Sequence, residues 1–125
     1  MRATPFLCVT LASLASALSF TVDGPAAQAQ SGDDAKIEAR VGTWGRNCKS
    51  AIADKFKAKT MADVEVSLAA SLRASIDAGE TSLADIQRSG LSFDFRVHHV
   101  PGKDPEGYCN TDGQGNVDEI KNMHN

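Results

Sequence analysis

The sequence contains none of the short motifs by which many enzymes are identified. It has no glycine-rich phosphate loop, no nucleophile motif and no zinc-enzyme signature. It also has no internal repeat and no low-complexity tract. Because these usual signs of catalysis and cofactor binding are missing, we expect no cofactor and no resident metal. Compartment, fold class and charge distribution are the properties that can still be inferred.

Long apolar runs are also scarce: the main one covers residues 6–22 and contains several Ser and Thr residues. It falls a little short of the ~20 apolar residues that a membrane span needs. Arg2 precedes it and Ala27-Gln28-Ala29 follows it, which is the order of charge, apolar core and cleavage site in a secretory signal peptide. We therefore predict a cleaved signal peptide at residues 1–29 and one small domain at residues 30–125. The mature protein would be periplasmic or secreted, with no transmembrane segment.

Cysteine is scarce, with three residues in the chain. Cys8 lies in the predicted signal peptide, which leaves Cys48 and Cys109 in the mature domain. An even number of cysteines in an exported protein favours a disulfide, and closing so long a loop stabilises a fold by roughly 4 kcal/mol in chain-entropy models. The alternative is a metal site in which His98 or His99 joins the two thiolates. An oxidising compartment favours the disulfide.

Apolar residues at three- and four-residue steps predict an amphipathic helix over residues 33–60, begun by a cap at Asp33 or Asp34. Its apolar stripe consists of Ile37, Val41, Trp44, Cys48, Ile52 and Phe56. Gly42 and Gly45 each weaken the helix by roughly 1 kcal/mol relative to alanine. They let another element approach closely, mark a bend in the helix, or are simply tolerated.

A second helix is predicted over residues 61–78, opened by a capping box from Thr60 to Asp63 and stopped by Gly79. The alternation of residues 64–68 is a competing signal for a strand, but the helical pattern runs longer. A third, short helix is expected to begin at Thr81 or Ser82 and to end before Gly90.

From residue 91 onward, the spacing of apolar residues changes from the helical repeat to an alternation of period two. Residues 91–97 alternate between apolar and polar side chains and predict a half-buried antiparallel strand. A second strand is expected around Tyr108 and Cys109, and a short third one over residues 117–120, before a loose tail. The predicted fold class is α+β, with two to three N-terminal helices packed on one face of a small C-terminal antiparallel sheet and one disulfide.

Two patterns resemble metal sites without meeting their requirements. Residues 110–118 are similar to a calcium loop, but Lys121 stands where the bidentate glutamate belongs, so we expect a glycine-rich β-turn. His98 and His99 are neighbours at a strand end, and neighbours in a strand point to opposite faces. We therefore interpret these histidines as surface or loop residues.

An enzymatic reading is the alternative to a binding function. Asp94, Arg96 and His98 project from one strand on the face opposite Phe93 and Phe95. An acid, a cation and a base in a row could serve acid–base catalysis, as in a small secreted hydrolase of ribonuclease-like architecture. A polar outer face is, however, the normal state of a half-exposed strand.

Charge is distributed unevenly, although the net charge is only −3. Residues 36–59 carry seven cations and two acids, whereas residues 60–125 carry five cations and eleven acids. This asymmetry predicts an acidic protein or a polyanionic envelope surface as partner of the basic helix, and no specific nucleic acid. The candidate contact residues are Arg40, Arg46, Lys49 and Lys57. The other interpretation is that the acidic remainder of the fold neutralises the helix internally.

Taken as a whole, the sequence predicts a small exported, disulfide-stabilised protein that acts by binding, as an envelope accessory factor, inhibitor or effector. We expect it to have no catalysis of its own.

Overall fold

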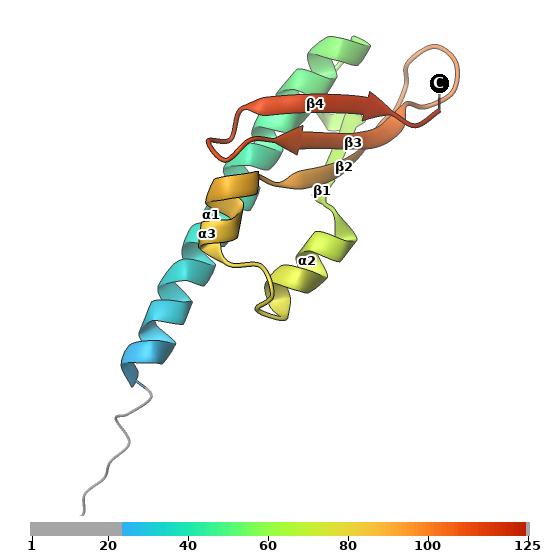
Figure 1. Cartoon of the computed structure of the whole chain (residues 1–125). Helices are drawn as coiled ribbons and strands as arrows, with labels where there is room; N and C mark the ends of the chain where they lie inside the picture. Colours follow the sequence, from blue (N-terminus) through green and yellow to red (C-terminus); the bar gives the residue numbers. More distant parts are fainter. Residues whose placement is uncertain (1–23, 125) are drawn as a thin grey trace, which may run out of the picture.

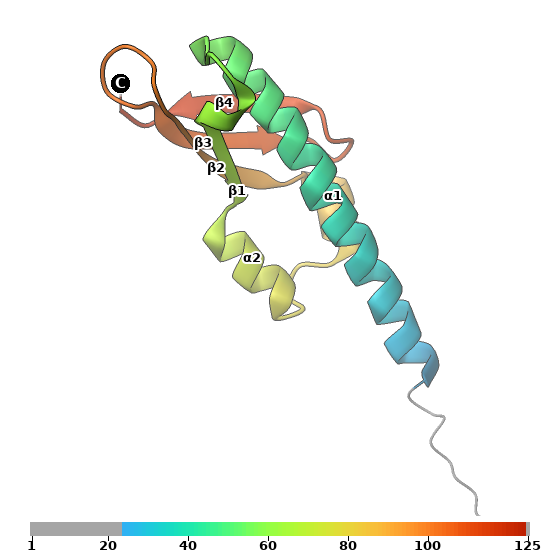
Figure 2. The ribbon, with the colours of Figure 1, turned by 180° about the vertical axis from the view of Figure 1, so that it is seen from behind.

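The computed structural model describes residues 24–124, with side chains described from Gly32 onward. The elements follow in the order α1 (Gly24–Phe56), η2 (Met61–Asp63), β1 (Val64–Leu68), α2 (Ala70–Asp77), α3 (Leu83–Ser89), β2 (Ser92–Val97), β3 (Glu106–Thr111) and β4 (Val117–Asn122). Figure 1 shows β3 and β4 in front of α1, and Figure 2 shows α1 crossing the opposite face of the sheet. In the described part of the chain, no helix combines the length and the apolar character required to cross a membrane.

The four strands form one antiparallel sheet in the order β1-β2-β3-β4, so β1 and β4 are its edges. The register places Phe93 of β2 opposite Leu68 of β1 on one side and Cys109 of β3 on the other. Buried and exposed residues alternate along β2, because one face of the sheet meets α1 and the other is open. The predicted α+β class with one disulfide is confirmed, and the sheet has four strands where two or three are expected.

Helix α1 is longer at its start and shorter at its end than the predicted span of 33–60. It begins at Gly24, where Pro25 is tolerated because a first-turn N–H has no helical partner. It ends at Phe56 because Lys57 takes a left-handed conformation, with φ of 58°. The Ala58 N–H then donates to Ala53 O at 3.0 Å, which closes a Schellman motif. Most of the predicted signal peptide, residues 1–23, lies outside the described residues.

The predicted second helix is wrong over its first half. Residues 64–68 form strand β1, and only Ala70–Asp77 is α-helical. Before β1, Met61–Asp63 form the 3-10 helix η2, in which the Thr60 side chain makes no capping hydrogen bond, so the predicted capping box is wrong. The alternative based on alternation was correct: Val64 is buried, Glu65 is exposed, and the whole segment pairs with β2. Gly79 ends α2 as expected, with φ of 78°. Pairing with a distant strand has overridden a local helical pattern.

The remaining elements match the sequence closely. Ser82 and Asp85 form a capping box at the start of α3, each accepting a backbone N–H from the other. The β3–β4 connection is a turn held by Asp112, whose carboxylate Oδ1 accepts the Gln114 and Asn116 N–H groups. The predicted β-turn is therefore confirmed. The prediction of a loose tail over residues 121–125 is wrong at Lys121 and Asn122, which belong to β4.

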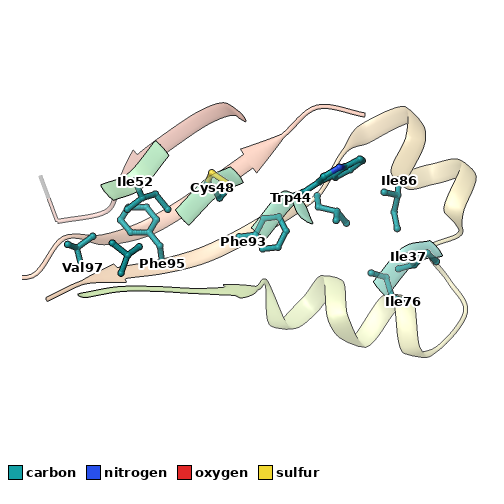
Figure 3. Packing of buried hydrophobic residues seen from close by; sticks show 12 residues of the cluster. Ile37, Trp44, Cys48, Ile52, Ile76, Ile86, Phe93, Phe95 and Val97 are labelled. Carbon is teal, nitrogen blue, oxygen red and sulfur yellow. A yellow bond between two sulfur atoms is a disulfide. The ribbon is translucent and has the colours of Figure 1, made fainter. Parts of the chain in front are cut away.

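The core lies between α1 and the sheet, as Figure 3 shows. Phe56 and Phe95 stack with ring centroids 5.5 Å apart, and Ile76 and Ile86 close the core at the end where α2 and α3 lie. Cys48 and Cys109 are fully buried and bonded, with Cα atoms 6.1 Å apart. The predicted disulfide is confirmed, and it joins α1 to β3.

Candidate functional site

A groove of about 290 Å³ lies between α1 and the edge strand β1. Its apolar lining consists of Val41 on the helix side, Val66 and Leu68 on the strand side, and the ring of Phe93. Arg46 and Lys49 of α1 add two cations to the same groove. Apolar contact area and positive charge therefore occur together at one exposed junction.

Two glycines shape the helical wall of this groove. At Gly45 an added Cβ would lie 3.3 Å from Cε1 of Phe93, so this glycine lets the helix approach the sheet closely. At Gly42 an added Cβ would meet only Nη1 of Arg46, at 3.6 Å, which is ordinary contact. The packing of the fold explains Gly45 but does not explain Gly42, which leaves open space in the wall.

The two cations of the groove are not neutralised by the fold. The Arg46 guanidinium donates from Nη2 to Thr43 Oγ1 at 3.3 Å, a neutral acceptor on the same helix. Among the residues that the structure describes, neither Arg46 nor Lys49 forms an ion pair. In contrast, Glu38 on α1 accepts from both terminal nitrogens of Arg73, which lowers the pKa of the Glu38 carboxyl. Among the described residues, the ion pair of α1 thus involves one of its acids, Glu38, and none of its cations, so the groove stays cationic.

The four cations predicted to contact a partner do not form one patch. Arg46 and Lys49 line the groove, whereas Lys57 lies at the C-terminal end of α1. Arg40 lies over the indole of Trp44, 5.6 Å from its ring centroid, beside Gly113 of the β3–β4 connection. Its Nη1 is buried without a hydrogen-bond partner among the described residues. The structure thus brings together two of the four.

The outer face of the sheet carries a second concentration of polar groups. Asp94 and Arg96 are exposed while Phe93 and Phe95 are buried, as the alternation predicts. Arg96 forms an ion pair with Glu106 of β3 at 2.8 Å, which raises the pKa of the guanidinium and lowers that of the Glu106 carboxyl. Arg96 therefore already has an anionic partner.

His98 lies just beyond the end of β2 with both ring nitrogens occupied. Nε2 forms a hydrogen bond with Glu65, and Nδ1 lies 3.0 Å from Oδ2 of Asp104. The hydrogen bond to Glu65, followed by that to Asp104, raises the pKa of the imidazole. A substrate could exchange a proton with this ring only after one of these contacts broke. The geometry is that of a structural histidine bound to two carboxylates more than that of a poised base.

The other two histidines also bind carboxylates. Nδ1 of His99 lies 2.8 Å from Asp63, which lowers the pKa of that carboxyl, and Nε2 of His124 lies 3.0 Å from Glu106. His98 and His99 thus have different partners, and their ring centroids are 6.2 Å apart. In the described part of the chain, no three His, Cys, Asp or Glu side chains are arranged to hold a metal ion.

Sequence reasoning missed the groove itself and the carboxylates around the histidines. The groove depends on residues 64–68 being a strand, and their alternation was the signal that could have found it. Glu65 of β1 and Glu106 of β3 reach the histidines through the sheet register, whereas Asp104 lies in the loop that follows His98.

Comparison with known proteins adds no family to this geometry: the chain matches no family model, no curated protein and no solved structure.

Proposed function

We propose that this chain is a small exported, disulfide-stabilised protein that binds an acidic partner through the groove between α1 and β1. It acts as an envelope accessory factor, inhibitor or effector, without catalysis of its own. The observation that carries the proposal is the pair Arg46 and Lys49, which have no carboxylate partner among the described residues and lie beside an apolar groove. Charge next to apolar area favours a partner that offers both acidic and apolar side chains.

Export is supported by the signal-peptide pattern of residues 1–29 and by the disulfide, because stable disulfides belong to oxidising compartments. Cleavage before Gln30 would leave the core-facing stretch of α1, from Ile37 to Phe56, in place. The periplasm or the extracellular space is therefore the proposed location.

The proposal is tested with two double variants of equal charge change. The variant Arg46→Glu with Lys49→Glu reverses the charge of the groove. The variant Lys36→Glu with Lys59→Glu reverses the charge at two exposed positions away from it. Binding of a labelled glutamate-rich peptide is measured by fluorescence anisotropy, and the melting temperature of each protein is recorded. We expect the groove variant to lose about tenfold or more in affinity, with unchanged melting, and the control to lose much less.

Equal losses in the two double variants would contradict the groove as the site, because they would indicate non-specific attraction. Vesicles of anionic phospholipid are the second probe. Binding to vesicles without binding to the peptide would replace the acidic protein by a membrane surface as the partner.

The alternative is a small secreted hydrolase that uses Asp94, Arg96 and His98 on the open sheet face. Their common face supports it, whereas the ion pair of Arg96 and the two carboxylates on His98 weigh against it. Hydrolysis of RNA by the wild type, lost in His98→Ala, would establish this alternative in place of the binding function.

A further inference from the structure

In the part of the chain that the structure describes, strand β1 has backbone groups along the groove that no other strand pairs. Its ladder with β2 is flanked by two hydrogen bonds, from Ala69 N–H to Ser92 O at 3.0 Å and from His98 N–H to Asp63 O at 2.8 Å. In an antiparallel pair, residues whose backbone N–H and C=O groups bond the neighbouring strand alternate with residues whose groups point away from it. The backbone groups of Glu65 and Ser67 therefore face β2.

It follows from the same alternation that the N–H and C=O groups of Val66 and Leu68 point away from the sheet. Val64 shares their direction, but its N–H already donates to Met61 O. The side chains of Val66 and Leu68 line the groove and are half-buried. Free hydrogen-bonding groups and an apolar groove thus lie side by side at the edge of the sheet.

We propose that an extended acidic segment of the partner protein adds to β1 as a fifth strand, with alternate side chains in the groove. This inference rests on the proposed function and specifies its mode of recognition. A strand pairs at about 4.8 Å from its neighbour and directs every second side chain to the same face. Main-chain bonds to Val66 and Leu68 would give affinity, and the groove would select the side chains.

Three features of the groove favour an extended acidic segment as its occupant. Gly42 leaves its section of the helical wall without a side chain, which gives room for an apolar residue of the segment. Arg46 and Lys49 would pair with acidic residues on the groove face. On the opposite face, exposed Glu65 borders the added strand and repels acidic residues there. The segment is therefore acidic on the groove face and uncharged on the other.

A second copy of the chain fits this edge less well. Two β1 strands pairing with each other would bring Arg46 and Lys49 of one copy to the junction that already holds the same cations of the other. Like charges at such a junction are unfavourable. Charge complementarity therefore selects an acidic segment over self-association.

The probe is the blocked peptide acetyl-Thr-Val-Thr-Glu-Thr-Val-Thr-Glu-amide, and its control replaces both glutamates by lysine. Amide hydrogen exchange of the full exported domain is followed by NMR with and without the peptide. We expect the Val66 and Leu68 amides to exchange at least about tenfold more slowly in the complex, because they gain hydrogen bonds. The Glu65 and Ser67 amides, already bonded to β2, should change little.

The outcomes separate this proposal from the proposed function. If the glutamate peptide binds through Arg46 and Lys49 but leaves Val66 and Leu68 unprotected, strand addition is wrong and the binding function stands. If the lysine peptide binds as well as the glutamate peptide, or neither binds, both proposals are wrong. Protection that grows with protein concentration in the absence of peptide would assign the edge to a second copy.

A variant in the wall provides an independent test. Gly42→Leu fills the open section of the groove, whereas Ser50→Leu places the same side chain on the same helix outside it. We expect Gly42→Leu to weaken peptide binding about tenfold or more, without lowering the melting temperature, because leucine is a better helix former than glycine. Ser50→Leu should bind like the wild type. Unchanged peptide affinity in Gly42→Leu would contradict the proposed placement of the strand.

Discussion

Gly115 packs against the indole of Trp44 so closely that an added Cβ would fall 2.3 Å from Nε1. The glycine has φ of 89°, in the region that favours glycine, and its carbonyl oxygen accepts a hydrogen bond from Asn47 Nδ2 at 3.0 Å. Trp44 and Asn47 belong to α1, and Gly115 belongs to the connection between β3 and β4. This contact therefore joins the last hairpin to the first helix independently of the disulfide.

We expect Gly115→Ala to lower the free energy of unfolding by about 3 kcal/mol, because it combines a strained backbone with a steric clash against a buried ring. Urea unfolding measures the loss. Gly102→Ala is the matched control, because Gly102 also has a positive φ, of 86°, but an added Cβ there meets nothing within 4 Å. The control should lose only about 1 kcal/mol. Equal losses would show that the Trp44 contact contributes nothing.

Removal of the disulfide is expected to destabilise the protein more than either glycine substitution. Cys48 and Cys109 are 61 positions apart, and opening a loop of this length costs roughly 4 kcal/mol in chain-entropy models. Replacing both by alanine also leaves a small cavity in the core. Thermal unfolding of the double variant measures the effect, with wild type plus reductant as the comparison. A melting temperature unchanged from the oxidised wild type would contradict the expectation.

Lys57→Gly should stabilise the protein. Lys57 closes α1 with φ of 58°, a conformation that costs a lysine roughly 1 kcal/mol more than a glycine. Because the Lys57 side chain is exposed, little packing is lost. We expect a gain of about 0.5–1 kcal/mol in the free energy of unfolding, measured by urea. Lys59→Gly, just beyond the helix, is the control and should give no gain.

His98 predicts a pH dependence of stability near neutrality. Its contacts with Glu65 and Asp104 raise its pKa above the ordinary 6.5, so the folded protein holds this proton more tightly than the unfolded chain. The contribution is fully present below pH 6.5 and disappears as the pH rises through the higher folded pKa. We expect the melting temperature to fall across this window in the wild type.

The variant His98→Gln distinguishes the contribution of His98 to this pH dependence from any contribution of His99 and His124. Glutamine retains hydrogen-bonding capacity but does not titrate, so the fall in melting temperature across the same window should be reduced. NMR titration of the His98 ring in the wild type gives its pKa directly. A value at or below 6.5 would contradict the role of the two carboxylates.

The secondary structure could be predicted wherever one periodicity was unambiguous. Residues 91–97 alternate strictly, and the strand formed as expected. Residues 64–68 fit both periods, because Val64 and Leu68 are one helical turn apart while Val66 adds the alternation. Only the pairing of residues 64–68 with β2 decides between helix and strand, and β2 comes after both α2 and α3 in the chain. Local pattern alone does not contain that information.

The candidate site could be predicted only in part for the same reason. The charge distribution shows that Arg46 and Lys49 belong to a cationic segment, and the sequence shows that Gly42 lies nearby. Their common position in a groove requires β1 to be an edge strand, which is a property of the assembled sheet. The end of α1 at Lys57 was missed because a lysine in a left-handed C-terminal position carries no sequence signal, unlike glycine.

The disulfide also determines how the molecule responds to a single peptide-bond cleavage. Most of the sheet and both short helices lie within the loop that Cys48 and Cys109 close. A tryptic cut after the exposed Lys103 would leave two pieces held in one particle, and their separation would become visible only after reduction. A cut after Lys121 lies outside the loop, so its fragment has no covalent tie to the rest. Nicked and intact molecules would therefore co-migrate without reductant at the first position and differ at the second.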